Sequence, residues 1–198
     1  MELNRLFFAL WPTDPVRQQT RDLARALAIR LHPGGRFVAA ERYHLTLAFL
    51  GDQVSAAREA AAIQAAATVR SPPFHLKLDH ANSFRNNRSL PWWFGSREPQ
   101  PALTLLYERL REALQRGGAP PERLKFSPHL TVVRDATQAL SPTPIGPIDW
   151  AVEEFVLIRS RLDLQPASYE ILGRWPLDPD APTAPEPDVA RPQLDLGF

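Results

Sequence analysis

Two stretches that lie far apart in the chain, RYHLTLAFLG at residues 42–51 and FSPHLTVVRD at residues 126–135, share a histidine followed by leucine, threonine and an aliphatic residue. Apolar and polar residues alternate in both, which is typical of a half-buried β-strand. Side chains two apart lie on the same face of a strand. The sequence therefore predicts two strands of similar design, each with a polar His-x-Thr face and an aliphatic face for the core.

The polar faces of these strands carry the residues that we expect to form an active site. His44 and Thr46 share one face, and His129 and Thr131 are their equivalents in the second strand. Imidazole titrates near neutral pH, so one histidine can accept a proton while the other donates one. Threonine hydroxyls donate hydrogen bonds to an anionic oxygen, and Arg134 can add a cation. If the two strands face each other, these residues form a metal-free phosphodiester site.

Two other interpretations of these histidines are possible. A single His-x-Thr in a strand is most often structural, but two copies half a chain apart favour function. A zinc site is a poor fit, because no cysteine or nearby carboxylate completes the ligand set. The remaining histidines, His32, His75 and His80, are expected to be structural. His32 follows a predicted helix, whose dipole favours a histidine there, and His75 and His80 have opposite parity on one strand. We therefore expect neither a metal nor a cofactor.

The composition excludes several classes of protein. The chain has 198 residues, 44% of them hydrophobic, as expected for one globular domain. It has no cysteine, which excludes disulfides, thiolate metal sites and cysteine nucleophiles. No apolar run approaches the roughly 20 residues that span a bilayer, and LFFALW near the start is too short for a signal peptide. We expect a cytoplasmic protein with no membrane partner, and a monomer as the default assembly.

Charge is distributed unevenly, although the formal net charge is only +1. The acidic residues of the last segment, 178–198, leave residues 1–177 basic, and the bases are nearly all arginines. Arginine binds phosphate or carboxylate in a planar, bidentate manner. This composition is compatible with an anionic ligand. A GC-rich genome, which encodes basic residues mainly as arginine, explains it equally well.

The order of the predicted elements indicates two similar halves. Strands and helices are interleaved, with two strand-helix-strand sections that suggest two lobes, each contributing one His-x-Thr strand. The segment 178–198 is proline-rich and acidic, so we expect a domain over residues 1–177 and an extended or disordered tail. Strands are expected over 5–12, 37–51, 72–84, 89–96, 129–133, 150–162 and 169–177, and helices over 13–31, 55–70 and 101–118.

At its two motifs the chain resembles the two-histidine phosphoesterase superfamily. The sequences His44-Leu-Thr-Leu and His129-Leu-Thr-Val are similar to the two HxTx motifs of that superfamily. Within it, the chain resembles the bacterial and archaeal RNA 2′,3′-cyclic phosphodiesterases, also called 2′-5′ RNA ligases. RLFFAL near the start and the closing pattern FVLIRSRL…YEILGRWPL support the resemblance, which covers residues 5–177.

The resemblance implies a fold and a reaction. The fold is α+β, with two pseudo-symmetric lobes whose antiparallel sheets face a central cleft, and with helices outside. The reaction is metal-independent hydrolysis of an RNA 2′,3′-cyclic phosphate to a 2′-phosphate. By the same resemblance His44 donates a proton to the departing 3′ oxygen, His129 activates water, and Thr46, Thr131 and Arg134 bind the phosphate. Proton chemistry by itself does not decide which histidine is the acid.

The resemblance also implies partners and a reverse reaction. The partners are RNA ends that bear a 2′,3′-cyclic phosphate, with tRNA halves as one candidate. The reverse reaction joins a 5′-hydroxyl RNA end to the cyclic phosphate through a 2′-5′ bond without ATP, because the strained ring supplies the driving force.

The segment NSFRNNRSLPWWFG is a candidate nucleotide-facing region. Its aromatic residues can stack on a base, and Arg85 or Arg88 can contact a backbone phosphate. The alternative is that Trp92, Trp93 and Phe94 are alternating strand residues, of which at least half belong to the core.

Two other functions remain open from the sequence. One is a two-histidine phosphoesterase for a small substrate, such as a nucleotide or ADP-ribose cyclic phosphate. The other is an RNA-end binding protein without significant catalysis.

Overall fold

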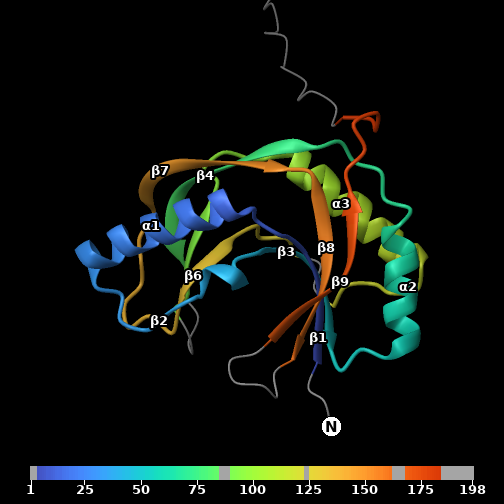
Figure 1. Cartoon of the computed structure of the whole chain (residues 1–198), viewed down its shortest axis with the longest axis horizontal. Helices are drawn as coiled ribbons and strands as arrows, with labels where there is room; N and C mark the ends of the chain where they lie inside the picture. Colours follow the sequence, from blue (N-terminus) through green and yellow to red (C-terminus); the bar gives the residue numbers. More distant parts are fainter. Residues whose placement is uncertain (1–3, 85–89, 123–124, 162–167, 184–198) are drawn as a thin grey trace, which may run out of the picture.

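The computed structural model describes residues 4–84, 90–122, 125–161 and 168–183, and it has the α+β architecture that the sequence predicted. In Figure 1 the helices lie outside a curved sheet, with one helix on one side of the view and the other two together on the opposite side. The helical segments of the described residues are α1 (Asp14–Leu31), which is the helix that lies apart, α2 (Ala56–Ala66), α3 (Pro101–Arg116) and a short 3₁₀ turn, η1 (Ala40–Arg42).

The strands of the described residues form one connected, antiparallel sheet. They are β1 (Asn4–Leu10), β2 (Arg36–Phe37), β3 (Leu45–Asp52), β4 (Phe74–Ser83), β5 (Trp92–Gly95), β6 (Leu130–Arg134), β7 (Thr143–Val152), β8 (Glu154–Arg161) and β9 (Ser168–Pro176). Their order in the sheet is β7-β4-β5-β6-β3-β1-β8-β9, and β2 pairs with β6 beside this path.

The centre of the sheet is the contact between β3 and β6, which pair through Leu45 and Leu130. On one side of this pair lie β5, β4 and β7, and on the other lie β1, β8 and β9. Each half of the sheet therefore contributes one of the two His-x-Thr strands. The pseudo-symmetric lobes remain a prediction, because the strands join in a single continuous sheet.

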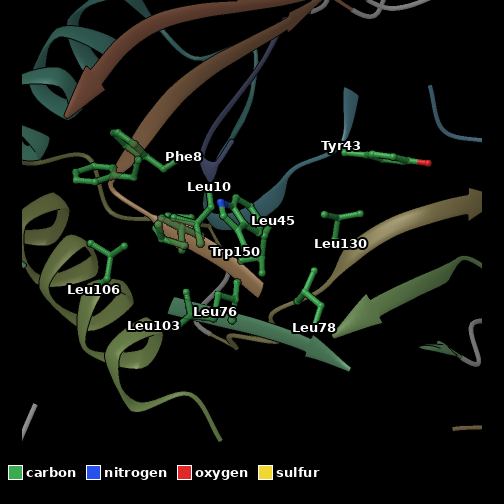
Figure 2. Close-up of a cluster of buried hydrophobic side chains, with 14 of the residues drawn as sticks. Phe8, Leu10, Tyr43, Leu45, Leu76, Leu78, Leu103, Leu106, Leu130 and Trp150 are labelled. Carbon is green, nitrogen blue, oxygen red and sulfur yellow. The ribbon is translucent and has the colours of Figure 1, made fainter. Parts of the chain in front are cut away.

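The aliphatic faces of β3 and β6 are buried, as their alternation predicted. Leu45 and Leu130 are 1% and 0% exposed. Figure 2 shows both in the core, together with Leu103 from α3 and Trp150 from β7. Burial of a large apolar side chain contributes roughly 1.5–3 kcal/mol, so this core holds the two strands firmly. Their opposite faces remain available for polar residues.

Helix α1 covers the half of the sheet that contains β7. It buries Val16, Thr20, Ala24 and Leu27, which recur at the three- and four-residue spacing of a helix face. Helix α2 is rich in alanine, and its small side chains let α3 pack closely against it.

The single strand predicted over residues 150–162 is wrong. The chain leaves β7 at Val152 and enters β8 at Glu154, and β7 extends back to Thr143 through Pro144 and Pro147. Prolines argue against a central strand, but an edge strand tolerates them because one side of its backbone needs no ladder partner. β7 is such an edge strand.

The continuous strand predicted over residues 37–51 is also interrupted. Between β2 and β3 the chain forms the turn η1, because tertiary contacts override the local β preference. The guanidinium of Arg17 on α1 donates a hydrogen bond to the carbonyl oxygen of Ala40, and the side chain of Tyr43 is buried at 1% exposure. This turn leads directly into His44.

The first residues of the predicted tail pack on the domain. The backbone N–H of Asp178 donates a 2.9 Å hydrogen bond to the carbonyl oxygen of Ser71, and Ala181 is buried. Residues 184–198 of the predicted tail lie outside the described residues. In the described part of the chain, no helix has the length and apolar character needed to cross a membrane.

Candidate active site

The pairing of β3 with β6 brings the two motifs together. In an antiparallel pair, the residue before one partner lies opposite the residue after the other. The register Leu45 to Leu130 therefore sets His44 opposite Thr131, and Thr46 opposite His129. All four lie on the face opposite to the buried leucines.

A pocket of about 350 Å³ opens on this polar face. All five residues that the sequence predicted for the site contribute to its wall. Of the three further residues of the wall, Pro91 belongs to the segment predicted to face a nucleotide, and Arg36 and Asp135 were not predicted. The lining residues are Arg36, His44, Thr46, Pro91, His129, Thr131, Arg134 and Asp135.

The two imidazole rings are held in the same way. Each histidine lies one residue before its strand. Nδ1 of His44 is 2.7 Å from the carbonyl oxygen of Arg42, and Nδ1 of His129 is 2.7 Å from that of Ser127. A carbonyl oxygen only accepts, so Nδ1 carries the proton in both rings. In its neutral form each ring therefore has its lone pair on Nε2, the atom that remains for proton exchange with a ligand.

The surroundings of the rings favour their neutral forms. Burial lowers the pKa of His44 to about 4, and the positive charges of Arg134, His129 and Arg42 act in the same direction. Burial, with a contribution from Arg134, also lowers the pKa of His129. An anion bound in the pocket would oppose these charges and raise both pKa values.

The cations of the pocket differ in their partners. Arg36 on β2 forms a 2.6 Å ion pair with Asp135, whereas the guanidinium of Arg134 has no ion pair with any described residue. Arg134 is therefore free to bind an anion. Arg36 was not predicted, because a two-residue strand such as β2 has no detectable periodicity. Asp135 was not predicted either, and it lies at the pocket as the ion-pair partner of Arg36. The pairing of Arg36 with Arg134 across β2 and β6 brings it to the pocket.

Aromatic rings flank His44 on one side of the site. The ring centroid of Phe7 on β1 lies 5.0 Å from that of the His44 imidazole. The ring centroid of Tyr169 on β9 lies 5.5 Å from it, in an edge-to-face arrangement. Neither residue was predicted, since only the folded sheet brings β1 and β9 to the motif.

His129 has a similar environment, from the segment predicted to face a nucleotide. The ring centroid of Phe84 lies 4.8 Å from that of the His129 imidazole, edge to face, and the ring centroid of Trp93 lies 6.1 Å from it. Trp92 and Phe94 are core residues at 1% and 0% exposure. Trp93 therefore points toward the site and its two neighbours toward the core, which agrees with the alternation. Arg85 and Arg88 lie outside the described residues.

The other histidines do not line the pocket. His32 caps the C-terminal end of α1 in a left-handed conformation, Nδ1 of His75 lies within hydrogen-bond distance of a carboxylate oxygen of Asp149 at 2.9 Å, and His80 packs edge-on against Trp93. Among the residues that the structure describes, no three imidazole or carboxylate groups are arranged as a metal site. Independence from metal ions remains a prediction about the reaction.

Comparisons with known proteins show which family the chain is similar to. The family described as LigT like Phosphoesterase matches residues 10–93. A protein of Escherichia coli (strain K12) named RNA 2′,3′-cyclic phosphodiesterase is 38% identical over 179 residues, covering 89% of this chain and 98% of its own.

Solved structures have the same fold. Crystal structures of E. coli LigT complexed with 3′-AMP and with phosphate align with TM-scores of 0.71 and 0.70 and identities of 37% and 35%. Each alignment covers 89% of this chain and 99% of the other. With its paired motifs and this similarity along most of its length, the chain belongs to the LigT-like phosphoesterases of the two-histidine superfamily.

Proposed function

We propose that this protein hydrolyses RNA 2′,3′-cyclic phosphate ends to 2′-phosphates by general acid-base catalysis. The observation that carries the proposal is the matched pair of imidazoles, both with Nδ1 protonated and both lining one pocket. The relative named RNA 2′,3′-cyclic phosphodiesterase supports the substrate class. The LigT complexes with phosphate and 3′-AMP support a nucleotide phosphate as the ligand.

The reaction is an in-line displacement at phosphorus. Nε2 of His129 takes a proton from a water molecule, whose oxygen forms the new bond to phosphorus. The bond from phosphorus to the 3′ oxygen breaks, and Nε2 of His44 donates a proton to that oxygen. The 2′ bond is retained, so the product is a 2′-phosphate.

The remaining polar groups of the pocket stabilise the phosphate. The hydroxyls of Thr46 and Thr131 donate hydrogen bonds to non-bridging oxygens, and Arg134 offsets their negative charge. Fixed donors of this kind act on charge that develops in the transition state without having to reorganise.

Substrate binding supplies the condition under which His44 acts as an acid. With a pKa of about 4, its ring is neutral in the free protein at pH 7. The anionic phosphate favours the charged imidazolium, so the pKa of His44 rises when the pocket is filled. The proton is then held where the leaving oxygen needs it.

The same site can also join RNA ends. With a 5′-hydroxyl RNA end in place of water, Nε2 of His129 takes the hydroxyl proton, the 5′ oxygen bonds to phosphorus, and His44 protonates the leaving 3′ oxygen, which leaves a 2′-5′ bond. In the reverse of this step, which forms the cyclic phosphate again, the two histidines exchange roles. Ligation of a 5′-hydroxyl end to a cyclic phosphate needs no ATP, because the ring strain drives it. We propose RNA ends such as tRNA halves in the cytoplasm as substrates.

A hydrolysis assay in EDTA tests the proposal. Purified protein is incubated with an oligoribonucleotide that ends in a 2′,3′-cyclic phosphate, and the product is analysed for a 2′-phosphate. His44→Ala and His129→Ala should each lose at least about a hundredfold in rate, as is typical for removing a general acid or base. His75→Ala, which removes an exposed imidazole outside the pocket, is the matched control.

The outcomes separate the alternatives. Turnover of mononucleotide cyclic phosphates alone would favour a small-molecule phosphoesterase. Tight binding of the oligonucleotide without turnover, unaffected by either active-site substitution, would favour an RNA-end binding protein. Turnover abolished by EDTA would contradict the metal-independent mechanism.

A further inference from the structure

The two halves of the active site differ at the residue two before each histidine. The residue two before each histidine accepts the Nδ1 hydrogen bond with its main-chain carbonyl oxygen, and this residue is Arg42 in one half and Ser127 in the other. Since serine serves this role equally well, ring orientation does not require the arginine side chain. The guanidinium of Arg42 is therefore available for another task.

The position of this guanidinium is defined by Tyr169. The Cζ atom of Arg42 lies 4.8 Å from the centroid of the Tyr169 ring, and the same ring contacts His44 edge to face. A guanidinium that lies over an aromatic face still presents its N–H groups along its own edge, where they can bind an anion.

Arg42 lacks a counterion in the described part of the chain. Its side chain makes no ion pair there, and its Nε atom is buried without a hydrogen-bond partner. By contrast, Arg159 is bound by Glu59 and Glu170. A partly buried cation beside an active site, with unused donors, is suited to bind a substrate anion.

The direction of the reaction indicates which anion this is. This step rests on the proposed function. In an in-line displacement the leaving 3′ oxygen and the attacking water lie on opposite sides of phosphorus. If His44 protonates the 3′ oxygen, the ribose of the terminal nucleotide lies on the side of His44. Tyr169 and Arg42 lie on this side of the site, where the phosphodiester at the 5′ end of that ribose can reach the guanidinium.

We propose that Arg42, held by Tyr169, binds the phosphate on the 5′ side of the terminal nucleotide and so selects RNA ends over nucleosides. Only an oligonucleotide or a 5′-phosphorylated nucleotide carries this second phosphate. Arg42 is then a specificity residue, distinct from the residues that hold the reacting phosphate.

Two small substrates that differ by one group test the proposal. One is adenosine 2′,3′-cyclic phosphate with a 5′-hydroxyl, and the other carries an added 5′-phosphate. The kcat/KM of the wild-type protein should be about 10- to 100-fold higher for the second, the size expected for a charge-assisted hydrogen bond. Arg42→Gln should abolish this preference and change kcat/KM for the first by less than about threefold, since it removes only a weak like-charge effect on His44.

Two further variants control for folding and for net charge. Arg42→Lys keeps the positive charge without the planar stack, so it should retain part of the preference if the glutamine variant does not fold. Arg116→Gln, on the exposed surface of α3, removes the same charge away from the site and should leave the preference intact.

The results that would contradict the role of Arg42 can be told apart. An equal loss on both substrates in the Arg42 variants would mean that the side chain only supports His44, and a wild-type protein without preference would mean that no such subsite exists. If the wild-type protein cleaves neither substrate nor a longer RNA, the proposed function fails, and this inference fails with it.

Discussion

Leu45 and Leu130 form the pair that joins β3 to β6, and each stands directly between the histidine and the threonine of its motif. The side chains of both leucines are buried in the core, so packing on one face of the sheet determines the geometry of polar groups on the other. The chemistry of the pocket is therefore sensitive to core substitutions that never contact a ligand.

Leu130→Ala should affect both stability and activity. Leu130 is fully buried, and its truncation should lower the free energy of unfolding by about 2–5 kcal/mol through lost burial and a cavity. Relaxation around the cavity shifts His129 and Thr131, so kcat/KM per folded molecule should also fall. Urea unfolding and steady-state kinetics on the cyclic phosphate RNA measure the two effects.

A core leucine away from the motifs supplies the control for this substitution. Leu103 on α3 is 1% exposed, so Leu103→Ala should cost similar stability while preserving kcat/KM of the folded protein. Equal activity of the two variants would contradict the link between this strand pair and the site.

Arg134→Gln should raise the pKa of both active-site histidines. The positive charge of Arg134 disfavours protonation of His44 and His129 in the free protein. Its removal makes both imidazolium ions easier to form, so each histidine should titrate at a higher pH than in the wild type. NMR titration of the imidazole Cε1–H signals measures this directly. Unchanged or lower pKa values would show that Arg134 does not act on the rings through its charge.

Thr46→Val should weaken turnover less than the loss of a histidine. The substitution removes one hydroxyl donor and preserves the shape of the side chain, so a loss of about tenfold in kcat/KM is expected for one hydrogen bond. Thr46→Ser keeps the hydroxyl and should recover most of the activity. A folded valine variant with wild-type turnover would exclude Thr46 from phosphate binding.

Arg17→Met should loosen the turn that precedes His44. Arg17 is 8% exposed, and its Nε donates a 2.9 Å hydrogen bond to the carbonyl oxygen of Pro12 while the guanidinium also bonds Ala40 in η1. We expect a loss of about 1–3 kcal/mol in unfolding free energy, since buried carbonyl groups lose their donor. The midpoint temperature of thermal unfolding and the value of kcat should both decrease.

The exposed Arg25 on the same helix provides the comparison for Arg17. Arg25→Met should leave stability within about 0.5 kcal/mol of the wild type, as is usual for surface positions. If both variants behave alike, the anchoring of η1 by Arg17 is unimportant.

The part of the site that was predictable from sequence follows from the period of a β-strand. A repeat of two residues places His44 with Thr46, and His129 with Thr131, whatever the rest of the fold does. The burial of Leu45 supports the same rule. The local pattern of each strand therefore predicts its polar face, without any knowledge that the two strands are neighbours.

The residues that sequence analysis missed depend on tertiary contacts. Tyr169 reaches His44 only because β9, β8, β1 and β3 are consecutive in the sheet. Arg36 reaches the pocket through a strand of two residues. The edge strand β7 was missed because Pro144 and Pro147 count against a strand unless its position in the sheet is known.

The prolines of β7 also bear on how the molecule behaves at high concentration. β7 is the outermost strand on its side of the sheet, and its pairing with β4 is irregular between Leu78 and His80. Residues without an N–H and a bulge are both features that stop a sheet from growing by adding a neighbour's strand. On this side the protein is thus protected against edge-to-edge aggregation.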